Sequence, residues 1–234
     1  MKKIFFLLTA AFICADISAQ DVVMPKKDKV LNFGMKVGLN SALPVSTHIS
    51  VDGMTIENAH VLNKVGSFAG VMARINVDHF FLQPSVLWKH TKCNFLFDAV
   101  EPPSEERGIT PTFSQSLVMR LNSLEAPIVL GYDIVKENPY LLSCMAGVKL
   151  RYDYDVRFSS KQTYIEYQSI TTPYHLAICT AFQVVIGRIT FDAGYEFGIS
   201  PFQSDFIYKQ NQVERNMSLD SRLNGLNISL GLLF

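Results

Sequence analysis

The chain has 234 residues, of which 48% are hydrophobic and 18% are charged. Lys plus Arg and Asp plus Glu each number 21. This balance gives none of the basic excess that nucleic-acid-binding proteins use to contact phosphates. The four cysteines form no Cys-x-x-Cys pair, so the sequence indicates neither a disulfide framework nor a zinc site.

Residues 1–19 have the pattern of a signal peptide. Lys2 and Lys3 precede an apolar run from Ile4 to Ala15, and the small residue Ala19 stands before a predicted cleavage at Gln20. The run is too short to span a membrane as a helix. We therefore expect the mature protein to leave the cytoplasm.

Eight segments downstream alternate between apolar and polar residues with a period of two, which predicts β-strands. The clearest lie at 138–155 and 189–200, where Ile189, Phe191 and Ala193 alternate with Thr190 and Asp192. The full set comprises 32–42, 66–77, 80–91, 115–132, 138–155, 173–186, 189–200 and 225–234.

The connections alternate in length along the chain. Long polar stretches at 43–64, 92–114, 156–171 and 201–220 alternate with short turns at 78–79, 133–139 and 187–188. An up-and-down sheet places alternate connections at opposite ends, so one end carries short turns and the other long loops. The sequence therefore predicts an all-β fold: an eight-stranded antiparallel up-and-down transmembrane β-barrel with short periplasmic turns and long extracellular loops.

The two faces of the predicted strands differ in chemistry. The apolar face suits lipid, with Trp88 and several tyrosines near strand ends, and the opposite face is rich in small and charged residues suited to a narrow lumen. We expect a polar cluster in the lumen formed by Arg74, Glu125, Lys149, Arg151, Asp153, Asp192 and Glu196. We interpret this cluster as a salt-bridged plug. A proton or ion path is the alternative.

Two prolines interrupt this pattern. Pro84 and Pro127 fall inside predicted strands, where neither can donate a hydrogen bond to the sheet. We expect both to mark β-bulges near the short-turn rim.

The end of the chain is a well-patterned strand. Leu226, Ile228, Leu230 and Leu232 alternate with small or polar residues, and Phe234 is the last residue. A membrane barrel must pair its last strand with its first, because lipid offers no partner for open backbone groups. We expect 225–234 to close the barrel against the strand that begins near Asn32, and Phe234 to be a C-terminal signal for the barrel-assembly machinery. The expected division is a signal peptide at 1–19, a periplasmic segment at 20–31 and an outer-membrane barrel at 32–234.

Two segments resemble a known family. Residues 81–87 (FLQPSVL) and 124–132 (LEAPIVLGY) are similar to the LQPE-like and LEIPLLLKY-like segments of the PorT-like outer-membrane barrels of Bacteroidetes, and 33–40 (FGMKVGLN) is similar to their opening strand. Ser85, Ala126 and Gly131 depart from the family pattern. The resemblance implies an outer-membrane barrel, and it extends to a role in type IX protein secretion.

No catalytic motif accompanies these strands. The five histidines lack metal-ligand spacing, and the chain has neither a Gly-x-Ser-x-Gly elbow nor a Gly-rich phosphate loop. We therefore expect no catalytic, cofactor or metal site.

The predicted function is that of a non-catalytic accessory or structural component of a surface or secretion assembly. Its expected partners are outer-membrane lipid, the barrel-assembly machinery and secretion or surface proteins. The alternatives are an outer-membrane enzyme with its active site at the loop end, and a soluble secreted barrel that binds an apolar ligand.

Overall fold

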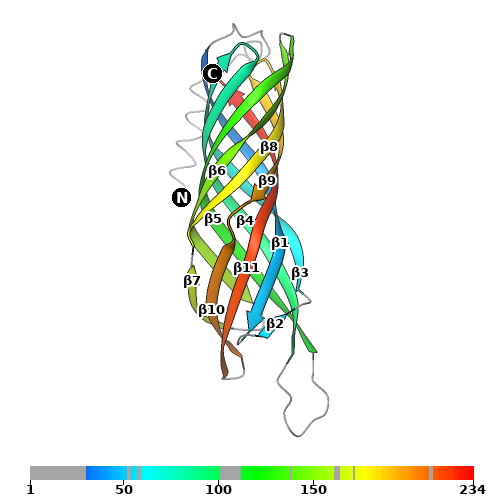
Figure 1. The fold of residues 1–234 in the computed structure, drawn as a ribbon, viewed down its shortest axis with the longest axis vertical. Helices are drawn as coiled ribbons and strands as arrows, with labels where there is room; N and C mark the ends of the chain where they lie inside the picture. Colours follow the sequence, from blue (N-terminus) through cyan, green and yellow to red (C-terminus); the bar gives the residue numbers. More distant parts are fainter. Residues whose placement is uncertain are drawn as a thin grey trace, which may run out of the picture.

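The fold is a closed, elongated β-barrel (Figure 1). The computed structural model describes residues 30–51, 54–56, 59–100, 112–137, 139–160, 164–170, 172–210 and 213–234. No helix long and apolar enough to cross a membrane occurs among these residues. In the described ranges, eight antiparallel strands form the ring: β1 (Leu31–Val51), β3 (Ala59–Val77), β4 (Phe80–Val100), β5 (Thr112–Glu137), β6 (Tyr140–Ser160), β8 (Tyr174–Ile186), β9 (Ile189–Gly198) and β11 (Val213–Leu233).

The seam of the ring joins the first and last strands. β1 pairs with β11 in antiparallel register from Gly34 opposite Leu233, and the backbone N–H of Phe234 donates to the carbonyl of Phe33 at 2.7 Å. Every ring strand therefore has a neighbour on both sides. The prediction of an eight-stranded up-and-down barrel is confirmed.

Three short strands extend the sheet at the long-loop end, the lower end in Figure 1: β2 (Met54–Ile56), β7 (Tyr164–Ile170) and β10 (Phe202–Gln210). Pro173 lies between β7 and β8, and Pro201 lies between β9 and β10. Each proline lacks a backbone donor, which accounts for an interruption at these points. β10 then pairs with β11 and with β7, so the sheet continues past both breaks.

The prediction of long loops at 43–64, 92–114, 156–171 and 201–220 is wrong for most of their length, where the structure has β-strands. β4 continues to Val100, β5 begins at Thr112 and β11 begins at Val213. The short 133–139 turn is also shorter than expected, because β5 runs on to Glu137 and β6 begins at Tyr140.

These strand extensions escaped the sequence pattern because the barrel reverses its polarity. Near the short turns the outer face is apolar, as at Ile128 and Leu130, which are 51% and 58% exposed. Towards the long-loop end the inner face becomes apolar, and a different group of side chains is buried: Cys93, Phe95, Met119, Leu121, Val156, Phe158, Phe202, Leu219 and Leu223.

A β-bulge produces this reversal on β6. The register between β5 and β6 shifts at this level, with Asn122 opposite Asp155 but Ser123 opposite Asp153, so Tyr154 is the extra residue. Even-numbered residues of β6 are apolar on both sides of the bulge. They face outward before it, as Tyr152 does, and inward after it, as Val156 does.

The two prolines inside strands mark no bulge, which corrects the expectation. Pro84 lies opposite Ile128 and Pro127 opposite Lys149, and the register is unbroken through both positions. Each missing donor coincides with a local gap in the pairing: the β3–β4 pairs stop between Leu82 and Ser85, beside Pro84, and the β4–β5 pairs stop between Glu125 and Ile128, beside Pro127.

Aromatic residues border the apolar outer band. Trp88, Tyr152 and Tyr174 lie in one outward row across β4, β6 and β8, and the ring centroids of Tyr152 and Tyr174 are 5.0 Å apart. At the short-turn edge Phe80 packs against Tyr132, with ring centroids 5.1 Å apart. Two aromatic borders around an apolar band are typical of a barrel surface that faces lipid.

Candidate functional site in the barrel interior

The lumen near the short turns is crossed by a network centred on Arg74. The guanidinium donates to the carboxylate of Asp133 at 2.7 Å and to the side-chain carbonyl of Gln183, and it lies 3.7 Å from the centroid of the Phe81 ring. Gln183 in turn donates to Asp192 at 2.8 Å. The network thus joins β3, β5, β8 and β9 across the barrel, and Phe81 provides a cation–π contact.

A second layer contains four charged groups that alternate in sign. Lys149 Nζ lies 3.0 Å from Glu125 and also contacts Glu196, while Lys89 Nζ lies 3.5 Å from Glu125 and 2.8 Å from Glu196. All four side chains are 12% exposed or less. Each cation meets both carboxylates, which offsets the cost of burying the charges.

A third group lies nearer the long-loop end. Asp153 is within 3.0 Å of Arg151 and 3.1 Å of His175, and all three side chains are buried or nearly so. The ring of His175 packs against Phe202, with centroids 5.7 Å apart. This group therefore borders the apolar inner side chains of the long-loop end.

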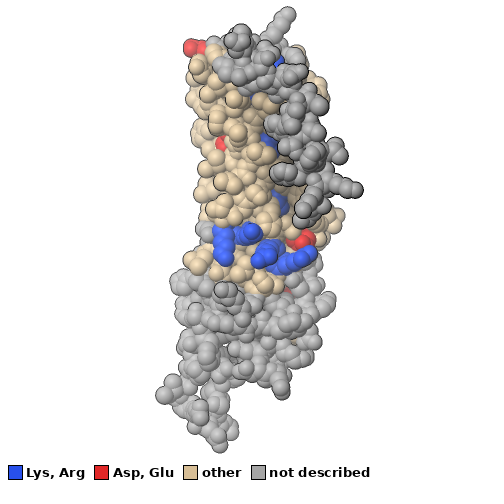
Figure 2. Space-filling view, turned by 180° about the vertical axis from the view of Figure 1, so that it is seen from behind, with Lys and Arg blue, Asp and Glu red and all other residues tan. Residues whose placement is uncertain are grey.

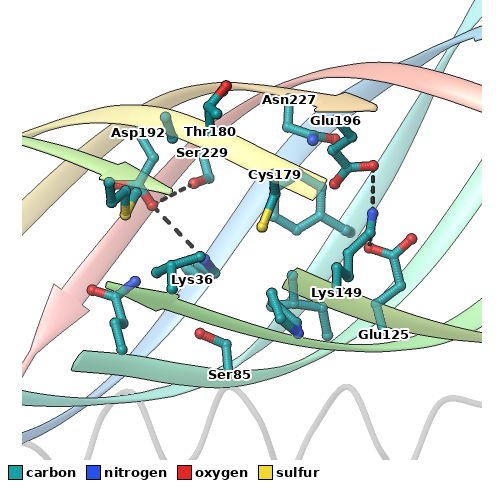
Figure 3. Close-up of a pocket in the computed structure, with 18 of the residues that line it drawn as sticks. Lys36, Ser85, Glu125, Lys149, Cys179, Thr180, Asp192, Glu196, Asn227 and Ser229 are labelled. Carbon is teal, nitrogen blue, oxygen red and sulfur yellow. Dashed lines mark hydrogen bonds and ion pairs between the residues drawn. The ribbon is translucent and has the colours of Figure 1, made fainter. Parts of the chain in front are cut away.

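A cavity of about 80 Å³ lies between the first two layers (Figure 3). Lys36, Gln83, Ser85, Asn227 and Ser229 are among the side chains that line it. Gln83 is 1% exposed, and neither end of its amide has a hydrogen-bond partner in the protein. The cavity has room for several water molecules, which are the usual partners of such a group.

The charges in the described part of the lumen balance. Five cations (Lys36, Arg74, Lys89, Lys149, Arg151) meet five carboxylates (Glu125, Asp133, Asp153, Asp192, Glu196), and each cation lies within 4.0 Å of at least one carboxylate. No group of three or more His, Cys, Asp or Glu among the described residues is placed to hold a metal ion. The arrangement neutralises buried charge and joins opposite walls of the barrel.

The structure places all seven residues of the expected polar cluster on the inner face, but in three separate groups. Sequence reasoning missed Lys36, Lys89, Asp133, Gln183 and His175 as members. Lys36 alternates in phase with Gly34 and Gly38, and Lys89 shares its face with Ser85 and Thr91, so the alternation carried a signal for both. Asp133 was missed because the end of its strand was read as a turn. The expected cleavage site at Ala19 and Gln20 lies outside the described residues.

Comparisons with known proteins agree with this architecture. The model of the family described as "Outer membrane protein beta-barrel domain" matches residues 18–204. No curated relative matches the chain in sequence. Among solved structures, OprG from Pseudomonas aeruginosa is 14% identical with a TM-score of 0.53, and the match covers 88% of this chain and 97% of OprG.

Two further structures are more distant. Ail of Yersinia pestis, solved in complex with the heparin analogue sucrose octasulfate, is 13% identical with a TM-score of 0.35; the match covers 88% of this chain and 100% of Ail. AlkL, solved in lipid bilayers, is 11% identical with a TM-score of 0.43, and the match covers 90% of this chain and 94% of AlkL. Both TM-scores are below 0.5, and neither similarity enters the argument.

The outer location of the apolar band, the closed ring and the matched family model agree, and the soluble-barrel alternative is set aside. The protein is an outer-membrane β-barrel whose apolar band lies in membrane lipid. The chain belongs to the outer membrane protein beta-barrel domain family.

Proposed function

We propose that this protein is a non-catalytic structural or accessory component of a surface assembly, with a lumen that serves as a brace and not as a pore. The observation that carries the proposal is the balanced set of ion pairs across the lumen. An eight-stranded interior is only wide enough for side chains to fill, and here those side chains pair with one another.

The long-loop end supports the proposed role in a surface assembly. β2, β7 and β10 continue the sheet beyond the apolar band, so the barrel presents an ordered β-surface outside the lipid. Ordered surfaces on a rigid scaffold commonly carry binding. The resemblance of 81–87 and 124–132 to PorT-like barrels extends the proposal to a type IX secretion assembly.

Insertion by the barrel-assembly machinery, with Phe234 as its recognition signal, is part of the same proposal. The backbone of Phe234 is paired to β1 in the closed barrel, and its side chain is 41% exposed. The side chain is therefore partly exposed at the completed seam.

Planar-bilayer recordings test the closed lumen. We expect the purified full-length protein to give no steady conductance, because charged and apolar side chains fill the interior. Sustained channels of porin size contradict the proposal.

A deletion strain tests the role in the assembly. We expect loss or retention in the periplasm of specific surface or secreted proteins, restored by the wild-type gene. Asp192→Asn/Glu196→Gln, if it folds, should restore export, because the proposal gives these carboxylates a structural and not a catalytic role. A deletion phenotype confined to altered membrane lipid, which this double variant fails to reverse, favours the enzyme alternative.

A further inference from the structure

Four cations form an unbroken row on the outer wall of the barrel. Lys64 of β3 lies directly opposite Lys92 of β4, Lys92 lies opposite Arg120 of β5, and Arg120 lies opposite Arg157 of β6. Lys64, Arg120 and Arg157 are exposed, and Lys92 is half-buried with buried neighbours on both sides in the chain. At the usual strand spacing the row is about 14 Å long.

Such a row is costly for the protein alone, because like charges directly opposite one another destabilise a sheet. Among the described side chains of this wall, the row has one carboxylate beside it, Asp155, which lies 3.0 Å from Arg157. Lys64, Lys92 and Arg120 have no ion-pair partner in the part of the chain that the structure describes. A group of Lys and Arg side chains is visible at this level in Figure 2.

The row lies just outside the lipid band. On β4, Lys92 follows the border residue Trp88 by four residues, which at a strand tilt of about 40° places it roughly 10 Å beyond the aromatic border. Between the two levels runs a polar chain, in which Asn122 hydrogen-bonds His90 and donates to Asp155 at 2.9 Å. Trp88 also donates to Tyr154 across the same border. The cations are therefore at the level of lipid headgroups.

Among the side chains that the structure describes, this arrangement occurs on one wall. On β11, the outward Arg222 lies opposite Val45 of β1, not opposite another cation, and its strand neighbour two residues away on the same face is Asp220. Arg222 is exposed like Arg120, so it offers a matched arginine outside the row.

We infer that the row Lys64–Lys92–Arg120–Arg157 binds the phosphate groups of a phosphorylated glycolipid headgroup in the outer leaflet. The headgroup supplies the negative charge that the wall lacks, at the height where the wall needs it, while the acyl chains lie against the apolar band below. This site lies on the outside of the barrel and does not depend on the role of the lumen or of the surface assembly.

Lipid titration of the full-length protein tests this inference. The protein is held in neutral detergent micelles, and its affinity is measured for phosphorylated lipid A, for dephosphorylated lipid A, for inorganic phosphate and for heparin. We expect phosphorylated lipid A to bind most tightly, because phosphates and acyl chains are then recognised together. Arg120→Gln should weaken this binding about fivefold, and Lys92→Gln/Arg120→Gln about 25-fold.

The controls preserve either the charge or the fold. Arg222→Gln should leave the affinity unchanged, and Lys92→Arg/Arg120→Lys should retain it. Heat-modifiable gel mobility shows that each variant is folded, and the single variants decide the matter if the double variant does not fold. Equal losses in Arg120→Gln and Arg222→Gln overturn the inference, as does equal binding of dephosphorylated lipid A. Tighter binding of heparin than of lipid A, abolished by the row variants, overturns it in favour of a sulfated glycan.

Discussion

Among the described glycines, Gly131 on β5 leaves the least room for a side chain. A Cβ atom built there would lie 2.0 Å from the Phe81 ring, whose face also receives the Arg74 guanidinium. Gly225 on β11 also faces inward, but the nearest atom to its Cβ would be the flexible end of Glu196 at 3.3 Å. A side chain at position 131 would therefore clash with the Phe81 ring, whereas a small side chain at position 225 would fit with little change.

The variant Gly131→Ala should destabilise the barrel by about 1–3 kcal/mol, because the methyl group displaces Phe81 and with it the cation–π contact of Arg74. Gly225→Ala is the matched control and should be nearly neutral. The free energy of unfolding is measured by urea titration of protein inserted in vesicles. Equal effects of the two substitutions would show that Phe81 moves aside without cost.

The environment of each strand's apolar residues changes along its length, from membrane lipid to a packed interior. On β11, Leu230 is 47% exposed on the outer face, whereas Leu223 is 7% exposed and faces inward beyond the lipid band. The same residue type thus lies against fluid acyl chains at one position and in a packed interior at the other.

This difference predicts unequal effects of one substitution. Leu223→Ala should cost about 2–5 kcal/mol, because packed neighbours leave a cavity. Leu230→Ala should cost less, since lipid chains fill the space that the side chain vacates. The two variants are compared by urea titration in the same vesicles, and a larger loss for Leu230→Ala contradicts the assignment of inner and outer faces.

The sequence predicted the strands well within the lipid band and poorly beyond it. Where one face meets lipid, alternation alone identified the strands, the short turns and the polar lumen, including Arg74 and Glu196. Beyond the lipid, the strands continue but the apolar face turns inward, on β6 through the extra residue Tyr154. No local sequence pattern predicts a bulge of this kind. The parts of the strands beyond the lipid band were therefore predicted as loops.

The sequence predicted which side chains face the lumen better than it predicted which of them pair with one another. Ion pairs such as Lys89 with Glu196 join residues 107 apart in sequence, and their meeting depends on the tilt and stagger of the closed ring. Alternation gives the face of each side chain and not its height. For that reason the single expected cluster is three groups in the structure.

As a whole molecule, the barrel should open from one end. The half beyond the lipid contains strands broken at Pro173 and Pro201 and is in contact with water, whereas the ring within the band has no free edge. In moderate urea we expect amide hydrogens of β10 to exchange before those of β8 and β9, measured by hydrogen exchange with mass spectrometry. Simultaneous exchange in all these strands would show that the two halves unfold as one unit.

Because the apolar face reverses between the two halves of the barrel, their stabilities depend on different surroundings. Burial of Phe95, Leu121 and Leu219 removes apolar surface from water, and such burial carries a large heat-capacity change. The outer face of the membrane half is instead transferred from water into lipid when the barrel forms, because an unpaired strand cannot remain in hydrocarbon. Cooling weakens stabilisation that depends on water. The stability of the half beyond the lipid therefore depends on the packing of its own side chains, whereas that of the half within the band depends also on the state of the membrane.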